Sequence, residues 1–558
     1  MSATVVPRLY SNFRGVDFRG KEINLTRSPD SLNMWKDYKE TESIRTRPSM
    51  QLKHHLGDHV YGILFYKDVM LVHCGRELFE IKDGEVKNIT PHKFGEASIG
   101  GFIHKDTLYI ITGSGFFSYN GDGKCEYVEG YVPTTSIGRK PSGGGTVHED
   151  VNMLTESRIN TFVGDGVSTE YYMDSPKWLG EDPLVWVNGE LLSSGYTWDA
   201  TDPRVVFDEA PPAPLTDGQD NVKIQFGVGH GMEKKIHGCQ IVQVFDNRVF
   251  FSGNPDYPNM VWHSSLNDPT YISDLDYYQE GLDEALIRGV VAGNNALWVF
   301  REPSDANTSV FYHTPVIDDQ YGKIYPSVHS SIATGCVGGA INFGDDIVFF
   351  SDRGMEGISG DITTEQAVAH RSSLVDRRLT AEPYYKNMVL VEWEGYLMVF
   401  IGDRCYLADS RAKFQNDDHF EYDWYYWKME QNITSATVHD GVLYLGGEFG
   451  VYTLTGDADL ESYWVTPLDK FKYPNMQKTT NKRGCVVEAE GEEISVFAKT
   501  NKEADFQLIG TYPVVTDAFV SRIKKKKFKD LQLKFYSPKR FSLETATMEC
   551  FVGGYIKR

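Results

Sequence analysis

One phrase recurs along this chain and constrains its fold more than any other feature. It is an acidic or Asn/Gly turn followed at once by a short apolar run, then a Gly or Ser break and a second short strand. Asp, Asn and Gly supply the turn and the apolar run supplies a strand facing the core, so each phrase predicts a β-hairpin. The phrase begins at seven places: Lys67, Lys105, Asp246, Asn294, Asp345, Glu394 and Asp440.

The spacing of these phrases indicates what they build. After Asp246 the next four follow at intervals of 48, 51, 49 and 46 residues. A period of about 40 to 50 residues with several strands per unit is typical of a β-propeller blade. The alternative, a long β-sandwich, has turns about every 8 to 12 residues without such a period. An aromatic fraction of 13% and 52 glycines also favour short strands. We expect an all-β fold, a β-propeller of about six or seven blades.

Two parts of the chain interrupt or follow the repeat. From Asp106 to Asp246 is 140 residues, too long for one blade, and strand-like stretches separated by Gly, Asp and Pro turns predict a small inserted β-sandwich there. After Thr455 the period stops, and alternating strands predict a C-terminal β domain. The expected organisation is an N-terminal arm (1–59), the first part of the propeller (60–130), a loop with the inserted β-sandwich (131–229), the second part of the propeller (230–460) and the C-terminal β domain (461–558).

The inserted segment carries a first resemblance. It opens with FVGDG at 162–166, continues with VNGELL at 187–192 and Tyr196, and nears its end with VF at 206–207 and APP at 210–212. This pattern resembles a module found widely in bacteriophage tail and fibre proteins. The resemblance covers the inserted segment alone.

The first half of the chain carries a second, independent resemblance. FRGVD at 13–17, SPDSLNM at 28–34 and IRTRPSM at 44–50 are similar to the opening of phage tail nozzle and packaged-DNA stabilisation proteins. Ser49 stands where that family usually has glycine. FSGNP at 251–255, with Pro258-Asn259 and Asp268-Pro269, is similar to a later segment of the same family.

The second resemblance implies a function. It implies a structural virion protein of a short-tailed phage, forming a ring that typically has six subunits and extends the portal and adaptor channel. That nozzle retains the packaged genome and conducts it at infection. The expected partners are other copies of the chain, the portal and adaptor, other tail proteins, and DNA that passes without sequence-specific binding. The expected location is the virion tail, after synthesis in the cytoplasm of the host bacterium.

Charge and composition further restrict the kinds of protein that this chain can be. The chain has 56 Lys and Arg against 78 Asp and Glu, a formal charge of −22, which argues against a broad nucleic-acid-gripping surface and suits a wall that DNA slides past. We expect no export signal, because Pro7 and Arg8 break the apolar run at the N-terminus. We also expect no membrane-spanning segment, because no apolar run reaches the roughly 18 residues that a span needs. Seven scattered cysteines without a CxxC pair predict neither zinc nor a disulfide framework.

The sequence predicts no catalytic, cofactor-binding or metal-binding residue, and we expect a protein that is not an enzyme. HExxH, Walker, GxSxG and EF-hand patterns are absent from the sequence. SDRGM at 351–355 is the nearest approach to the Asp-box of glycan-cleaving propellers, but it lacks the following Thr-Trp and is interpreted as a blade turn. The pairs Asp345-Asp346 and Asp417-Asp418 are interpreted as surface carboxylates.

Two clusters leave alternatives open. The aromatic run YDWYYW at 422–427 favours packing within a blade, but it could stack on sugar rings in a tail-tip propeller that binds or degrades host glycans. The basic run of Arg522, Lys524 to Lys527 and Lys529 favours a solvated face or a contact with an acidic neighbouring subunit, with DNA contact as the third choice. A cellular propeller scaffold is the remaining class, and the two resemblances make it the weakest.

Overall fold

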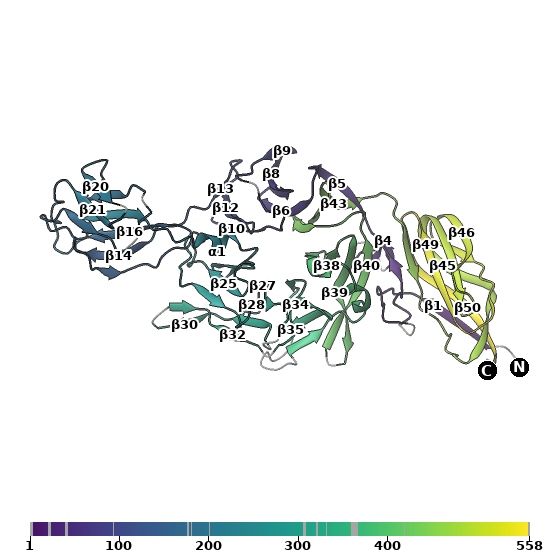
Figure 1. Ribbon diagram of the computed structural model, residues 1–558. Helices are drawn as coiled ribbons and strands as arrows, with labels where there is room; N and C mark the ends of the chain where they lie inside the picture. The colour runs from purple at the N-terminus through teal and green to yellow at the C-terminus, as the bar shows by residue number, and fades with distance from the viewer. Residues whose placement is uncertain are drawn as a thin grey trace.

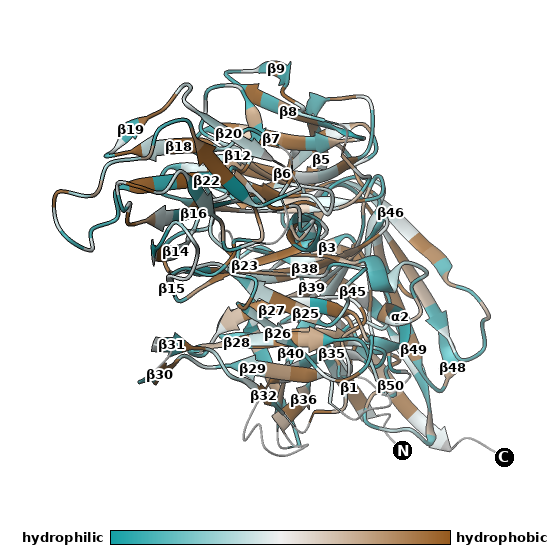
Figure 2. Ribbon diagram, turned by 60° about the vertical axis from the view of Figure 1, so that its left-hand side comes forward, coloured by the Kyte–Doolittle hydropathy of each residue, from teal (hydrophilic) through white to brown (hydrophobic). Residues whose placement is uncertain are grey.

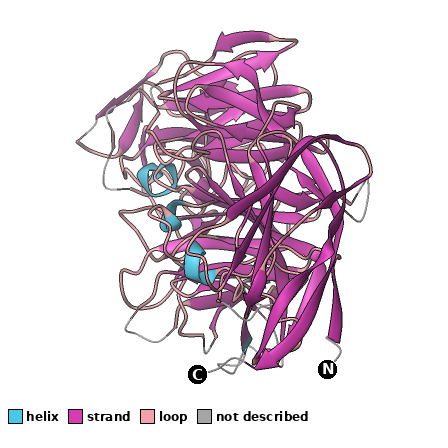
Figure 3. Cartoon of the chain, turned by 90° about the vertical axis from the view of Figure 1, so that its right-hand side faces the viewer, coloured by secondary structure: helices cyan, strands magenta, loops and turns pink. Residues whose placement is uncertain are grey.

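The chain folds into three β units in a row, the inserted β-sandwich, a β-propeller and the C-terminal β domain (Figure 1). Strands make up nearly all of the regular structure (Figure 3). The computed structural model describes residues 4–20, 24–38, 43–92, 94–175, 178–179, 181–199, 201–304, 308–319, 322–330, 332–358, 367–417 and 419–555.

The described residues form seven four-stranded antiparallel blades. Blades 1 to 3 are β6 (Val60–Tyr66), β7 (Val69–Cys74), β8 (Glu77–Lys82), β9 (Glu85–Asn88); β10 (Gly100–His104), β11 (Thr107–Ile111), β12 (Phe116–Tyr119), β13 (Cys125–Tyr127); and β23 (Ile241–Phe245), β24 (Arg248–Ser252), β25 (Met260–His263), β26 (Tyr277–Gln279). Blades 4 and 5 are β27 (Ile287–Gly293), β28 (Ala296–Arg301), β29 (Val310–His313), β32 (Ser327–His329); and β33 (Ala340–Phe343), β34 (Asp346–Ser351), β35 (Gly354–Ile358), β36 (Val368–His370). Blades 6 and 7 are β37 (Val389–Trp393), β38 (Tyr396–Ile401), β39 (Arg404–Asn416), β40 (His419–Lys428); and β41 (Ser435–His439), β42 (Val442–Gly446), β43 (Gly450–Gly456), β5 (Ser49–His55).

The blades close into a ring. Their first strands, β6, β10, β23, β27, β33, β37 and β41, contact one another in that order, and β41 contacts β6 again. The last blade takes its outer strand from the other end of the chain, because β5 pairs antiparallel with β43. The predicted β-propeller of about six or seven blades is therefore confirmed, and the described part of the chain contains seven.

The recurrent phrase corresponds to the first hairpin of each blade. The turn residues adopt positive φ, as at Asp246 (50°) and Asn247 (59°), which matches the twist of the flanking strands. The apolar run that follows is the second strand, and in β28, β34 and β38 every residue is buried. A second strand is covered on both faces by neighbouring blades, so its sequence is a continuous apolar run. Figure 2 shows the hydrophobic stretches on such internal strands.

The inserted unit is the small β-sandwich that the sequence predicts. One sheet has the order β15-β14-β16-β22-β18-β19 and the other β17-β21-β20. Buried aromatic and aliphatic side chains such as Phe162, Tyr171 and Ile224 lie between them. The strands are β14 (Thr134–Arg139), β15 (Thr146–Val147), β16 (Ser157–Phe162), β17 (Glu170–Tyr172), β18 (Leu184–Val187), β19 (Glu190–Leu191), β20 (Tyr196–Asp199), β21 (Arg204–Phe207) and β22 (Val222–Gly227).

The C-terminal β domain includes strands from the N-terminus. In its sheet β1 pairs with β50, β2 pairs with β44, and β4 pairs with both β3 and β50. Its strands are β1 (Thr4–Tyr10), β2 (Ser31–Leu32), β3 (Met34–Lys36), β4 (Ile44–Thr46), β44 (Ser462–Val465), β45 (Met476–Thr500), β46 (Gln507–Val515), β47 (Ala518–Ser521), β48 (Lys526–Phe528), β49 (Leu531–Ser537) and β50 (Phe541–Tyr555).

These pairings change the interpretation of residues 1–59 as one arm. The segment divides between two units, because β1 to β4 belong to the C-terminal sheet and β5 completes blade 7. Strand partners about 400 residues apart or more leave no local pattern in the sequence. The described helices are short, α1 (Glu233–His237), α2 (Asp376–Leu379) and the 3-10 turn Tyr385–Asn387, and no helix among the described residues has the length and apolarity to cross a membrane. All seven cysteines are buried and free.

Candidate functional site

The N-terminal segment fills the seam between blade 6 and the C-terminal β domain (Figure 1). Its described residues 12–20 and 24–36 are called the seam segment below. On one side β2 and β3 contact β40, the outer strand of blade 6, and on the other β2 pairs with β44. The phrases at 13–17 and 28–34 lie within this segment and the one at 44–50 follows it. Three of the stretches that carry the nozzle resemblance therefore lie at or next to this junction, while the stretch that begins at 251–255 lies in blade 3.

A buried carboxylate anchors the seam segment to the propeller. Asp423 on β40 has no exposed side-chain surface, and it accepts hydrogen bonds from Arg14 Nε at 2.6 Å and from Arg27 Nη2 at 2.6 Å. Burial raises the pKa of Asp423 even though both guanidinium groups act to lower it. Any placement that moved Arg27 away from this carboxylate would leave a buried charge unpaired. The ion pairs therefore favour this one position of the seam segment on blade 6.

A glycine lets the two backbones approach at the same place. Gly15 has φ of +86°, and a Cβ at this position would overlap the carbonyl oxygen of Trp424. The next residue, Val16, donates its backbone N–H to that same oxygen at 2.7 Å. Gly15 is thus required both for its left-handed backbone and for the close contact with β40.

Asn33 joins the seam segment to three other parts of the chain. Its Nδ2 donates to the Glu461 carbonyl at 2.9 Å, where the C-terminal β domain begins. Its Oδ1 accepts the backbone N–H of Lys428 at 2.9 Å and Nε of Arg47 at 3.1 Å. Arg47, also without exposed surface, donates further to the Lys428 carbonyl at 2.6 Å. These bonds fix the end of blade 6 against the C-terminal β domain, and sequence analysis marked Asn33 and Arg47 only as parts of a resemblance.

The aromatic run at 422–427 lies beneath this junction. Tyr422, Trp424, Tyr425 and Trp427 are buried to 1% exposure or less, and Tyr426 is half-buried. Trp427 lies edge-on to Trp35 of the seam segment, with ring centres 5.5 Å apart. Their faces are covered by protein, so these four rings pack the blade and offer no surface to a sugar.

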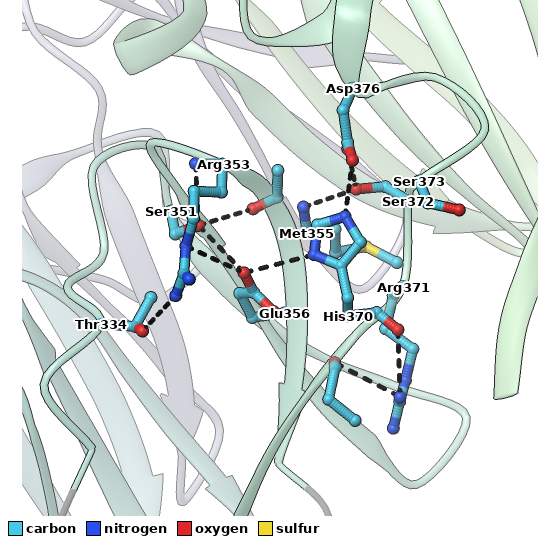
Figure 4. A network of polar contacts seen from close by, with 12 residues as sticks. Thr334, Ser351, Arg353, Met355, Glu356, His370, Arg371, Ser372, Ser373 and Asp376 are labelled. Carbon is cyan, nitrogen blue, oxygen red and sulfur yellow. Dashed lines mark hydrogen bonds and ion pairs between the residues drawn. The ribbon is translucent and has the colours of Figure 1, made fainter. Parts of the chain in front are cut away.

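The 351–355 turn lies beside a polar cluster at the edge of blade 5 (Figure 4). His370 lies between two carboxylates, with Nδ1 3.3 Å from Glu356 and Nε2 2.6 Å from Asp376. Arg353 lies 3.9 Å from Glu356 and donates to Thr334 at 2.6 Å. The cluster borders a cavity of about 570 Å³. No local sequence pattern marks this cluster, because its members come from four separate segments of the chain.

The geometry determines what His370 can do. Burial alone lowers its pKa, but the hydrogen bonds to Asp376 and Glu356 outweigh burial and raise the pKa of His370 to about 10. Both ring nitrogens then carry protons at neutral pH and both are engaged. A general base needs a free lone pair near pH 7, so this imidazolium is suited to cross-linking β36 with β35 and α2.

Replacing His370 with alanine is expected to lower stability by about 1–3 kcal/mol at pH 6 and by less as the pH rises. The pKa in the folded protein, about 10, exceeds the ordinary unfolded value of about 6.5. The contribution of the cluster is therefore complete below pH ~6.5 and is lost as the pH passes 10. Chemical unfolding midpoints at pH 6, 8 and 10 measure it, with exposed His55→Ala as control; equal losses at all three pH values would contradict it.

The two carboxylate pairs differ from each other. Asp345 is exposed in the blade 5 turn, as predicted, whereas Asp346 is buried, 2.9 Å from Arg371 and 2.8 Å from the Tyr422 hydroxyl. The surface interpretation is wrong for Asp346, because β34 lies between two blades and its first residue points inward. Asp417 lies in the β39–β40 turn with φ of 51°, and Asp418 lies outside the described residues.

Two groups among the described residues bring three metal-ligand atoms within 4.8 Å of one another, namely Asp68, His439 and Asp440, and Glu156, His230 and Glu233. In the first, both carboxylates are exposed and the His439 ring stacks on Phe65. In the second, His230 already uses both ring nitrogens, with the Thr155 carbonyl and the Met232 N–H. Neither arrangement marks a metal centre by itself.

The basic run lies at one end of the C-terminal β domain. Lys524, Lys526, Lys527 and Lys529 are exposed, while Lys525 pairs with Glu503. Short β48 at Lys526–Phe528 pairs with the beginning of β45, so the lysines lie on a hairpin edge and not in a cleft. The structure thus makes the cluster accessible to a partner.

Comparison with known proteins assigns the chain to no family. No family model and no curated protein matches the chain. Solved propellers are similar in outline, among them BamB from Moraxella catarrhalis (11% identity, 76% of this chain and 92% of that chain, TM-score 0.33), the Pan2 WD40 domain of Neurospora crassa (9%, 74% and 96%, 0.25) and the AfRom2 CNH domain (8%, 73% and 98%, 0.33). At these scores they add nothing to the fold that the sheet topology establishes.

Proposed function

We propose that this protein is a structural component of a bacteriophage tail, one subunit of a ring below the portal and adaptor that retains packaged DNA and conducts it at ejection. In this proposal the ring has six subunits and the protein has no enzymatic role. The observation that carries the proposal is that the three N-terminal nozzle-like phrases lie at or next to the seam. Arg14, Gly15, Asn33 and Arg47 belong to those phrases, and each makes a specific contact at the junction of propeller and C-terminal β domain.

The coincidence matters because the residues of these three phrases also make the contacts that fix the junction. Here the phrases hold together two units whose relative placement a ring subunit must keep fixed. A propeller fixed to a second β domain offers rigid faces on which neighbouring subunits can pack. Closed rings of subunits are built from repeated heterologous contacts of this kind. The likeness of the inserted unit to tail and fibre modules supports the same setting.

The charge is consistent with a conduit. A formal charge of −22 repels the phosphates of duplex DNA, so DNA is expected to pass without being held. The buried aromatic run removes the feature that most favoured a glycan-binding propeller at the tail tip.

Electron microscopy of the purified protein, alone and with portal–adaptor complexes, tests the proposal. We expect six-fold rings with a central channel that stack on the portal–adaptor assembly. Particles that stay single in the presence of those complexes would contradict the ring. Turnover of host envelope glycans, measured by release of reducing sugar, would contradict the structural role.

A further inference from the structure

Charge is distributed unevenly among the three β units. Residues 461–558 contain 18 Lys and Arg against 12 Asp and Glu, a formal charge of +6. Residues 131–229 contain 6 Lys and Arg against 15 Asp and Glu, a formal charge of −9. Two β units of nearly equal length therefore carry opposite charge, within a chain whose total is −22.

The two charged units lie at opposite ends of the molecule (Figure 1). The inserted β-sandwich extends from one side of the propeller, and the C-terminal β domain extends from the other, with both chain termini at its far end. The separation means that one molecule cannot bring its own inserted β-sandwich and C-terminal β domain into contact. A second copy can supply the missing contact.

The positive charge is concentrated at the far end of the C-terminal β domain. Exposed basic side chains lie on β48, on the residues before it and on the neighbouring part of β45, beside the end of β50, which runs to Tyr555. The backbone of Arg522 lies close to that of Gly484, so the chain positions of Arg483 and Arg522 are neighbours on this surface. This basic tip consists of Lys482, Arg483, Arg522, Lys524, Lys526 and Lys527.

The negative charge includes the far end of the inserted β-sandwich. β16 begins, and β22 ends, at the linkers that join the inserted unit to the propeller. The loops at the other ends of these two strands are therefore the most distant from the propeller. Asn221 ties these loops together through the Asn188 N–H, the Gly164 N–H and the Pro212 carbonyl. This acidic tip consists of Asp165, Glu190, Asp208, Glu209 and Asp217, all exposed.

The acidic tip also has a shape that a protein partner can fill. A cavity of about 980 Å³ lies between β18, β22 and the 212–221 loop. Trp186 lines it, and Leu215 stands fully exposed at its edge. Its lining mixes these apolar side chains with polar ones, among them Asp220 and Lys223. At a protein docking site of this kind, apolar contacts supply much of the affinity, and surrounding charges influence orientation and association rate.

We propose that the basic tip of one copy docks on the acidic tip of the next copy, head to tail. Two basic tips or two acidic tips repel each other, so the charges oppose a two-fold contact through either end and favour a heterologous one. The tip contact does not require the proposed ring, because a head-to-tail contact builds a closed ring when its rotation closes and an open chain when it does not. Duplex DNA would satisfy the basic tip alone and would leave the acidic tip without a role.

Charge reversal with complementation tests this contact. One variant carries Lys524→Glu, Lys526→Glu and Lys527→Glu, and the other carries Asp208→Lys, Glu209→Lys and Asp217→Lys. Each alone is expected to weaken self-association at least about 100-fold, because like charges then face each other. A mixture of the two restores association, since each altered tip meets its complement on the other variant. Sedimentation at 50 and 300 mM salt measures these changes, and higher salt weakens the wild-type contact.

The control variant reverses three exposed lysines of the propeller, Lys53, Lys82 and Lys124, and is expected to associate like the wild type. Association that ignores the tip reversals, a mixture that fails to recover, or wild-type protein that stays monomeric would each overturn the proposal. Salt-sensitive binding of duplex DNA, lost with the lysine reversals in a protein that does not self-associate, would also overturn it and assign the basic tip to DNA.

The outcomes separate this proposal from the proposed function. Six-fold rings that are insensitive to both reversals would refute the tip contact and leave the nozzle standing. Complementing tips that build open chains and never closed rings would support the tip contact and refute the nozzle.

Discussion

Replacing Asp423 with alanine is expected to lower the stability of the protein by about 3–5 kcal/mol, because it leaves a buried guanidinium without its counter-charge. Arg27 is 8% exposed and donates two hydrogen bonds to this carboxylate, while Arg14 donates a third. Neither arginine gains full access to water when the carboxylate is removed. The seam segment then loses its main polar contact with blade 6.

Chemical unfolding followed by tryptophan fluorescence measures this effect, and limited proteolysis shows whether the N-terminal segment is released first. The matched control is Glu96→Ala, which removes a surface ion pair to Arg76 whose two side chains are more than half exposed; its expected effect is below about 1 kcal/mol. A loss at Asp423 no larger than this control would show that the seam is held by packing alone.

The propeller could be predicted because its signal is local. In each blade a turn with positive φ joins the first strand to a largely buried second strand, and the turn and the apolar run are recognisable within about ten residues of sequence. Asn294 and Asn295 with the run after them illustrate this, since both asparagines have positive φ and all six residues of β28 are buried. The period then fixed the architecture without any matching family.

The closure of the ring could not be predicted in the same way. β5 carries neither the turn nor the continuous apolar run, since most of Ser49–His55 is exposed or half-buried. Its role follows from pairing with β43, as in Gly450↔His55. β1 likewise shows its place only through β50, as in Thr4↔Val552. Pairings across the whole chain are decided by tertiary packing, which a single sequence does not display.

The polar clusters also combine residues with a local sequence signal and residues whose contacts depend on the fold. The 351–355 turn was recognised and interpreted as a blade turn, yet its importance comes from His370 and Asp376, which follow much later in the chain. For the seam, the sequence contains Arg14 and Arg27 but gives no indication that Asp423 accepts their hydrogen bonds. The sequence shows which charged residues the chain contains, but which of them pair with each other is known only from the folded structure.

The second large effect is expected at Trp427, and it separates a packing role from sugar binding. This indole has no exposed surface and lies against Trp35 and the guanidinium of Arg47, whose Cζ is 5.8 Å from the ring centre. Trp427→Ala is expected to lower stability by about 3–5 kcal/mol, since the lost volume leaves a cavity between blade 6 and the seam.

A graded pair of variants makes this prediction sharper. Among the described residues the Trp427 indole N–H makes no hydrogen bond, so Trp427→Phe keeps most of the packing, loses no polar contact and is expected to lose less than about 2 kcal/mol. Tyr384→Ala, at an aromatic ring that is 61% exposed, is the control and is expected to stay within about 1 kcal/mol. Unfolding midpoints for the three variants and glycan-array binding should be measured together. A Trp427→Ala protein of wild-type stability that loses binding to envelope glycans would reverse the assignment, because it would require the ring to be reachable by a sugar.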